Sequence, residues 1–330
     1  MIITAISDLH LTDKKPKNRS DVYFETCLEK FDWILGFSKK YSDALIIGGD
    51  VFDYPSVPRW FLGRIFKILR KYEQKIFVIP GQHDLRYHVK GLENTSLGVL
   101  INSGYMTLLK PDKKYMLGNA SIVGLGWEEK LEEKSGDILV THQMVTEFDP
   151  LWEGQTGYST APMILHKHKG FKCVISGDNH KCHSYINDAG QVNVNCGSVM
   201  RSKKDQINFD PRIWIIDTDN FTDVEYEYVP IKDAKKVFDF SRIELEEKKA
   251  ELQDPSLRTE STKRRFSQVT QMVAFFVNFF AALTIVGSLI ASLGGESEDL
   301  GKTIGTAVIF MIVWGALFAY YWFNEHKAAR

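Results

Sequence analysis

The sequence has few cysteines, almost no net charge and no internal repeats. Its four cysteines, Cys27, Cys173, Cys182 and Cys196, are scattered and form no Cys-x-x-Cys pair. This spacing argues against a thiolate zinc site and a disulfide scaffold, and it favours a reducing compartment. The 41 Lys and Arg residues nearly balance the 42 Asp and Glu residues, so the formal net charge is -1. Such a balance argues against a strongly basic, histone-like binder of nucleic acid.

The N-terminal end also lacks the long apolar run of a secretory signal. Met1 leads within a few residues to the polar Asp8 and His10, with no charged region before an apolar one. We therefore expect the chain before Arg265 to stay in the cytoplasm. The length of 330 residues suggests about two domains.

Short apolar segments alternate with amphipathic ones in the first part of the chain. Ile2–Ser7, Ala44–Ile47 and Lys75–Ile79 are apolar and rich in β-branched residues, which is typical of buried strands. Asp21–Tyr41 and Pro58–Tyr72 carry apolar residues at helical spacing. This alternation predicts an α/β fold with a layered sheet and right-handed crossovers.

Later segments predict more strands and one charged helix. The expected strands are Ser121–Leu125, Asp137–Thr141, Cys173–Ser176, Val192–Asn195, Arg212–Asp217 and a half-exposed Asp223–Val229. Asp239–Leu252 is charged and is predicted to be helical, and Gln253–Arg265 reads as a polar linker.

Residue types that ligate metals follow five of these strands directly. The clusters are Asp8-Leu9-His10, Gly49-Asp50, Gly81-Gln82-His83-Asp84, Thr141-His142 and Gly177-Asp178-Asn179-His180. Open α/β sheets bind ligands just beyond the carboxyl ends of their strands. A single such cluster is typical of a surface turn, but five in order can converge on one site.

This ordered set resembles the calcineurin-like metallophosphoesterase superfamily. The family pattern is Asp-x-His, Gly-Asp, Gly-Asn-His-Asp/Glu, a single His, and Gly-His-x-His, and the resemblance covers about residues 1–230. It implies two β-sheets packed face to face and flanked by helices, an αββα sandwich. It also implies two divalent metal ions at the strand ends, with Mn²⁺ favoured and Fe, Zn²⁺ or Mg²⁺ as alternatives.

The resemblance assigns a role to each side chain at these strand ends. Seven of them would hold metal: Asp8, His10 and His180 the first ion, Asp50 both ions, and Gln82, His142 and Asp178 the second. Gln82 and Asp178 stand where the family has Asn and His. Both changes fall at the second ion, where added oxygen ligands favour Mn²⁺ or Mg²⁺ over softer ions.

The resemblance also implies how the reaction proceeds. A hydroxide bridging the two metals would attack a phosphate ester in line. His83 would face the phosphate and either stabilise its charge or protonate the leaving oxygen, and Asp84 would hydrogen-bond to His83 and fix its tautomer. His183 and Arg201 are further candidates for substrate binding, although Arg201 fits a structural turn equally well.

The sequence indicates the substrate less specifically than it indicates the metal ligands. Gly49–Asp53 and Gly81–Tyr87 are most similar to the DNA-repair exonuclease branch, which includes phage and bacterial nuclease subunits, and this implies a nuclease or phosphodiesterase. The basic face of Pro58–Tyr72 suits a phosphate backbone, an anionic lipid or plain solvent. Alternatives are a phosphatase of nucleotide, protein or lipid-linked phosphates, and a non-catalytic metal-binding scaffold.

Two long uncharged runs occupy the C-terminal part of the chain. Residues 272–293 and 303–323 are each long enough to cross a hydrocarbon core of about 30 Å. Basic residues flank the pair, Lys263–Arg265 before it and Lys327 and Arg330 after it, while the connecting loop is acidic. The positive-inside rule then predicts a transmembrane hairpin with both ends in the cytoplasm.

The sequence therefore predicts three parts and a multi-pass membrane location. These are a catalytic domain over 1–232, a charged helix and linker over 233–267, and the hairpin over 268–330. The expected partners are a phosphoester substrate, with nucleic acid as one alternative, and a lipid bilayer. Asn278, a polar residue inside the first span, could hydrogen-bond to the second span or to another copy, and the latter would form a homo-oligomer.

Overall fold

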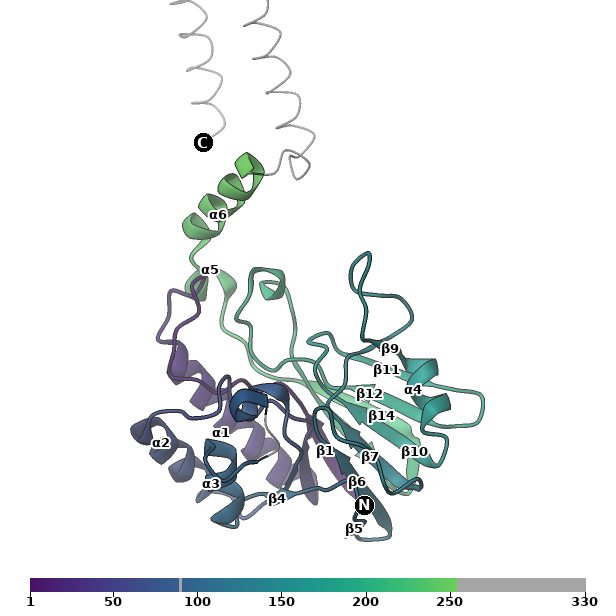
Figure 1. The fold of residues 1–330 in the computed structure, drawn as a ribbon. Coiled ribbons are helices and arrows are strands. Elements are labelled where there is room, and N and C mark those ends of the chain that lie inside the picture. Colours follow the sequence, from purple (N-terminus) through teal and green to yellow (C-terminus); the bar gives the residue numbers. More distant parts are fainter. Residues whose placement is uncertain (89–90, 254–330) are drawn as a thin grey trace, which may run out of the picture. The chain divides into compact units, whose positions relative to one another are not determined.

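The computed structural model describes residues 1–88 and 91–253 (Figure 1). One compact unit spans Met1–Leu245, and a second spans Glu246–Arg330. The predicted spans 272–293 and 303–323 lie outside the described residues. Among the helices of the described part, none has the length and apolarity that crossing a membrane requires.

The first sheet has six strands in the order β14-β13-β1-β2-β3-β4. Their bounds are β1 Ile2–Ile6, β2 Ala44–Ile47, β3 Lys75–Val78, β4 Thr107–Leu108, β13 Arg212–Asp217 and β14 Asn220–Tyr228. Strands β1 to β4 are parallel, and β13 joins β1 antiparallel. Three helices belong to this half: α1 Tyr23–Tyr41, α2 Arg59–Leu69 and α3 Ser96–Asn102.

The second sheet also has six strands, in the order β11-β12-β10-β7-β6-β5. Their bounds are β5 Tyr115–Leu117, β6 Ala120–Leu125, β7 Gly136–Thr141, β10 Phe171–Ser176, β11 His183–Ile186 and β12 Val192–Asn195. Strands β8 Val145–Thr146 and β9 Ser159–Thr160 form a separate pair before helix α4 Ala161–Lys167. Helices α5 Ala234–Val237 and α6 Phe240–Gln253 follow the sheets.

Three layers of buried side chains hold these elements together. Ile3 of β1, Ile175 of β10 and Trp214 of β13 belong to the cluster between the two sheets. A second cluster packs α1 to α3 on the first sheet, and a third packs α4 on the second. The predicted sandwich of two facing sheets flanked by helices is therefore confirmed for the described residues (Figure 1).

This topology sets where the loops meet. Strands β1, β2, β3, β7 and β10 run parallel within their sheets, so the loops after them leave from matching edges. Backbone hydrogen bonds join neighbouring loops: the Asp8 amide donates to the Gly49 carbonyl (3.1 Å), and the Gly177 amide donates to the Thr141 carbonyl (3.1 Å). All five clusters of candidate ligands lie on these loops.

Candidate metal centre

The backbone is strained at four of the candidate ligands. Asp8, His10, Asp50 and Asp178 have φ angles of 50°, 44°, 50° and 74°. This left-handed region is unfavourable for residues with a Cβ, at a cost of about 1–3 kcal/mol each, and such outliers gather at functional sites. The loops hold one another in this shape, since the His10 amide donates to the Asp50 carbonyl at 3.0 Å.

Two glycines allow the loops to approach this closely. A Cβ on Gly81 would lie 2.1 Å from Asp50 Oδ1, and one on Gly49 would lie 2.3 Å from His142 Nδ1. Gly49 also has a φ of 99°. The small residues before Asp50 and Gln82 are therefore needed for the candidate ligands to pack against the backbone.

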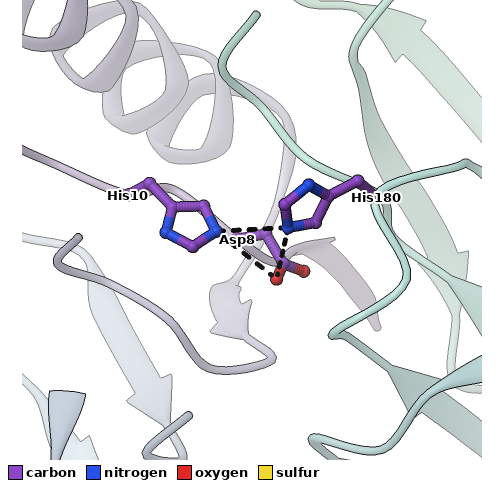
Figure 2. A group of neighbouring side chains, drawn as sticks. All are labelled: Asp8, His10 and His180. Carbon is purple, nitrogen blue, oxygen red and sulfur yellow. Dashed lines mark hydrogen bonds and ion pairs between the residues drawn. The ribbon is translucent and has the colours of Figure 1, made fainter. Parts of the chain in front are cut away.

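Asp8, His10 and His180 point toward one another from three loop positions (Figure 2). His10 Nε2 lies 3.3 Å from His180 Nε2, and Asp8 Oδ1 lies 3.6 Å from His180 Nε2 and 3.8 Å from His10 Nε2. Asp8 Oδ1 is buried and has no hydrogen-bond partner among the described residues. The three side chains form a group that could hold a metal ion.

A second group shares Asp8 and adds Asp50 and His142. Asp50 Oδ2 lies 3.4 Å from His142 Nε2 and 3.9 Å from His10 Nε2, so it faces both groups. His142 Nδ1 donates to the Gly48 carbonyl at 2.6 Å, which leaves the Nε2 lone pair directed at Asp50. Neither Asp50 Oδ2 nor His142 Nε2 has a hydrogen-bond partner in the described part of the chain.

The electrostatics of this group also suit a cation. Burial lowers the pKa of His142, but the carboxylates of Asp50, Asp8 and Asp178 outweigh it and raise that pKa to about 10. The excess of negative charge would thus draw a proton onto a fully buried imidazole. A divalent ion meets the same demand, because carboxylate and imidazole are both ligands of Mn²⁺, Fe and Zn²⁺.

Gln82 and Asp178 lie against each other. Gln82 Nε2 donates to Asp178 Oδ1 at 2.9 Å, and the Asp178 amide donates to Asp8 Oδ2 at 3.2 Å. Gln82 Oε1 is left buried without a partner among the residues described, so the amide oxygen is free to ligate. Burial raises the pKa of Asp178. Their assignment to the second ion stays a prediction.

A model of the calcineurin-like phosphoesterases matches residues 1–182. The chain belongs to this family. The match names the family as a whole, so the likeness to the DNA-repair branch is not confirmed by it.

Solved structures and curated proteins add little to this family assignment. TT1561 of Thermus thermophilus shares 14% identity and a TM-score of 0.43, covering 69% of this chain and 99% of its own. A single mutant of Vps29 from Entamoeba histolytica shares 14% identity and a TM-score of 0.36, covering 70% of this chain and 100% of its own. A search of curated proteins finds none that matches.

His83 of this phosphoesterase-family chain sits at the exposed side of the centre. Its backbone amide donates to Asp50 Oδ1 at 2.9 Å, and its ring stands edge-on to His10 with centroids 4.9 Å apart. Nδ1 lies 2.9 Å from the Asp53 carbonyl, to which it donates, so Nε2 is the ring nitrogen left to contact a substrate or a metal. His83 also forms a group with His10 and Asp50 that could hold a metal ion. The geometry thus permits either an acid or a ligand.

Asp84 differs from the expectation. Its buried carboxylate accepts from the amides of Phe52 (3.0 Å), Gly81 (3.1 Å) and Val51 (3.2 Å), and it does not orient His83. Burial and the nearby Asp50 charge raise the pKa of Asp84 to about 7. Asp84 therefore ties the loop after β2 to the loop after β3, and the Asp53 carbonyl fixes the His83 tautomer in its place.

Arg201 also differs from the expectation of a phosphate contact. Its buried guanidinium donates to the carbonyls of Ile207 (2.8 Å) and Lys232, which makes it a brace of the segment after β12. Lys30 braces the same segment, donating to the Val199 carbonyl at 2.7 Å. Burial and the neighbouring guanidiniums lower the pKa of Lys30 to about 7.

His183 is the buried first residue of β11, paired with Asn195 across to β12. It belongs to none of the candidate metal groups found among the described residues. Burial lowers its pKa, so the imidazole is held neutral. Its Nε2 is buried without a hydrogen-bond partner among the described residues, and its contact with substrate stays a prediction.

Residues that support His180 escaped the sequence analysis. Asn195 Nδ2 donates to the carbonyls of Asn179 (2.8 Å) and Lys181 (2.6 Å), on either side of His180. The Gln206 side-chain amide lies 3.5 Å from His180 Nδ1. The one available signal was the alternation of valine and asparagine in the strand Val192–Asn195, because a buried side-chain amide needs hydrogen-bond partners.

Proposed function

We propose that the chain is a binuclear, metal-dependent phosphoesterase. One observation carries the proposal. Asp8 Oδ1, Asp50 Oδ2, Gln82 Oε1 and His142 Nε2 are buried, lack hydrogen-bond partners among the described residues, and lie on neighbouring loops. Each unpaired buried polar atom costs about 1–3 kcal/mol. Coordination of cations accounts for all four costs at once.

The residues present fit two ions. Asp8, His10 and His180 would hold the first, His142, Gln82 and Asp178 the second, with Asp50 between them. Two such ions, when bound, acidify a water molecule and neutralise phosphate charge. Oxygen atoms of Gln82 and Asp178 suit Mn²⁺ or Mg²⁺ better than softer ions.

A side chain of the protein would then supply the proton that the leaving oxygen of the substrate needs. His83 is exposed at the edge of the centre, and its Nδ1 proton is engaged by the Asp53 carbonyl. Its Nε2 is therefore the atom that would give a proton to the leaving oxygen.

The substrate class in this proposal is a phosphate ester. Action on DNA, as a nuclease or phosphodiesterase, is the narrower version, supported by the likeness of Gly49–Asp53 and Gly81–Tyr87 to the DNA-repair branch. We further propose that residues 1–232 form the catalytic domain, on the cytoplasmic side of a membrane, and that 268–330 anchor it. The two uncharged runs and their basic flanks support this anchor.

The test combines metal analysis with hydrolysis. Protein stripped with a chelator and reloaded with Mn²⁺ should retain about two ions per chain and hydrolyse bis-p-nitrophenyl phosphate. Asp50→Asn should lose metal and activity, while Asp188→Asn, which changes an exposed aspartate, should keep both. No metal retained, or no hydrolysis with any of Mn²⁺, Zn²⁺ and Mg²⁺, would contradict the proposal. Digestion of linear DNA then separates a nuclease from an enzyme of small substrates.

A further inference from the structure

Two segments far apart in the sequence lie side by side at one end of the first unit. These are residues 13–20, between β1 and α1, and residues 231–239, around α5 (Figure 1). The Ser20 amide donates to the Val237 carbonyl at 2.9 Å, and the Asp239 amide donates to the Asn18 carbonyl at 2.9 Å. These two hydrogen bonds hold the segments together, so their side chains form one continuous surface.

This surface is basic in a chain whose net charge is -1. Five exposed lysines, hereafter the lysine patch, come from the two segments: Lys14, Lys15, Lys17, Lys235 and Lys236. Lys14 Nζ lies 4.0 Å from the centre of the Tyr54 ring. The other four ammonium groups make no ion pair in the part of the chain that is described. The other basic side chains here are engaged, Arg19 with Asp21 and Lys232 with Glu29.

The acidic residues of the same segments do not neutralise the patch. Asp233 accepts from the Lys235 backbone amide at 2.9 Å and caps α5, and Asp13 accepts from the Tyr54 hydroxyl. Asp239 accepts from the Arg242 backbone amide at 3.0 Å. These three carboxylates stay negatively charged, but the five lysines outnumber them, so the patch keeps a net positive charge that can attract an external anion.

Apolar side chains flank the patch. Ile231 is 40% exposed and Phe240 is 39% exposed, one on each side of α5. A basic surface with exposed apolar side chains is typical of segments that lie on a bilayer, where lysines meet headgroups and apolar groups enter the acyl boundary. A phosphate backbone of nucleic acid would use the lysines but leaves Ile231 and Phe240 without a partner.

The rest of the sequence points the same way. After the patch, Lys263–Arg265 add further basic residues immediately before the uncharged run 272–293. Clusters of four to eight basic residues on the cytoplasmic side of a membrane segment are attracted to anionic lipid. Lys14 packs on Tyr54, and the neighbouring Asp53 lies 3.5 Å from His10 Nδ1, so a bilayer on the patch would bring headgroups near the candidate metal centre.

We propose that the lysine patch lies against the surface of an anionic lipid bilayer. This inference rests on the membrane attachment in the proposed function. The partner of the patch is then lipid. The substrate of the neighbouring metal centre is then a phosphoester presented at the bilayer surface.

The test uses the full chain mixed with an excess of vesicles, made of phosphatidylcholine alone or with added phosphatidylserine. A neutral reagent acetylates exposed lysines, and mass spectrometry gives the rate for each. Attraction to an anionic leaflet is worth about a fivefold change in occupancy per lysine. We therefore expect the patch lysines to react at least about fivefold more slowly on the anionic vesicles. High salt should abolish the difference, because it screens surface charge.

A matched pair of variants isolates the patch. Reversing Lys15, Lys17, Lys235 and Lys236 to Glu should return Lys14 to its rate on phosphatidylcholine. Reversing four other exposed lysines to Glu near β5 and β6, at the opposite end of the unit from α5, should leave Lys14 protected (Figure 1). These control positions are Lys110, Lys113, Lys130 and Lys134.

Each outcome decides the proposal. Slower acetylation on anionic vesicles, lost in the patch variant and kept in the control, supports it. Equal rates on both vesicles overturn it, and so does protection by duplex DNA without protection by anionic vesicles, which would assign the patch to nucleic acid. The proposed anchor is tested separately: an anchored protein should stay bound to phosphatidylcholine vesicles at high salt. The anchor and the lysine patch can therefore be refuted independently.

Discussion

Replacing Asp84 tests whether its carboxylate holds the loops of the candidate centre or serves His83. In Asp84→Asn one carboxylate oxygen becomes an amide nitrogen, which cannot accept a hydrogen bond. At least one of the three backbone amides that Asp84 now binds would lose its partner. An unsatisfied buried donor costs about 1–3 kcal/mol, so local opening of these loops should become roughly 5- to 150-fold more frequent.

Hydrogen exchange measured by mass spectrometry reads this change directly. The amides of Val51, Phe52 and Gly81 should exchange faster in Asp84→Asn by that factor, while those of the distant β5 and β6 should not change. Asp84→Ala removes all three acceptor contacts and should increase exchange further. Retention of Mn²⁺ should fall as well, because Asp50 and Gln82 lie on the loosened loops.

The control is His83→Ala, which removes the imidazole but leaves the three amide bonds of Asp84 in place. It should leave exchange at Val51, Phe52 and Gly81 unchanged. Unchanged exchange in Asp84→Asn, together with a loss of turnover equal to that of His83→Ala, would refute the reasoning. Asp84 would then act through His83, as the family resemblance suggested.

Four further outcomes are expected. Asp50→Asn should lose both ions, whereas His83→Ala should keep them and slow turnover by roughly 10²–10⁴; equal metal loss in the two would make His83 a ligand. Asp178→His should shift metal preference toward Zn²⁺ without abolishing hydrolysis, and an unchanged preference would remove Asp178 from the ligand set. The lowered pKa of Lys30, about 7 against 10.5, means that the unfolded state binds more protons between these values. Stability should therefore rise with pH across that window, and denaturant titrations of Lys30→Met should lack the rise. A chain ending near Glu260 should be soluble without detergent and hydrolyse a small diester at nearly the full-length rate; aggregation would show that the apolar runs pack on the catalytic domain.

The strands and the convergence of the ligand loops could be predicted from sequence. Ile2–Ser7 and Ala44–Ile47 are buried strands because they are short, apolar and β-branched, and the structure confirms both within one residue. Polar clusters at parallel strand ends have to meet at a sheet edge. Asp8, His10, Asp50, His142 and His180 accordingly lie together, although binding of metal by them stays a prediction.

The partners of individual polar groups could not be predicted. Whether Asp84 bonds to His83 or to three backbone amides depends on how two loops fold over each other, and sequence spacing does not determine that. For Arg201 the sequence left two roles open, because a guanidinium suits a phosphate and a set of carbonyls equally, and its burial favours the structural one. Asn195 was missed because its partners are backbone atoms of another loop, which leave no mark in the sequence.

The pairing of β1 with β13 has a consequence for how the chain becomes functional during synthesis. β1 precedes Asp8 and His10 directly, and its antiparallel neighbour, Arg212–Asp217, is made some two hundred residues later. The Val199 amide and Ser198 hydroxyl, which bind the Asp8 carbonyl, are also made late. The family match ends at residue 182, before either of them. A nascent chain stopped there holds every candidate metal ligand but lacks β13, the antiparallel neighbour of β1, so the centre should be completed only after these later residues are made.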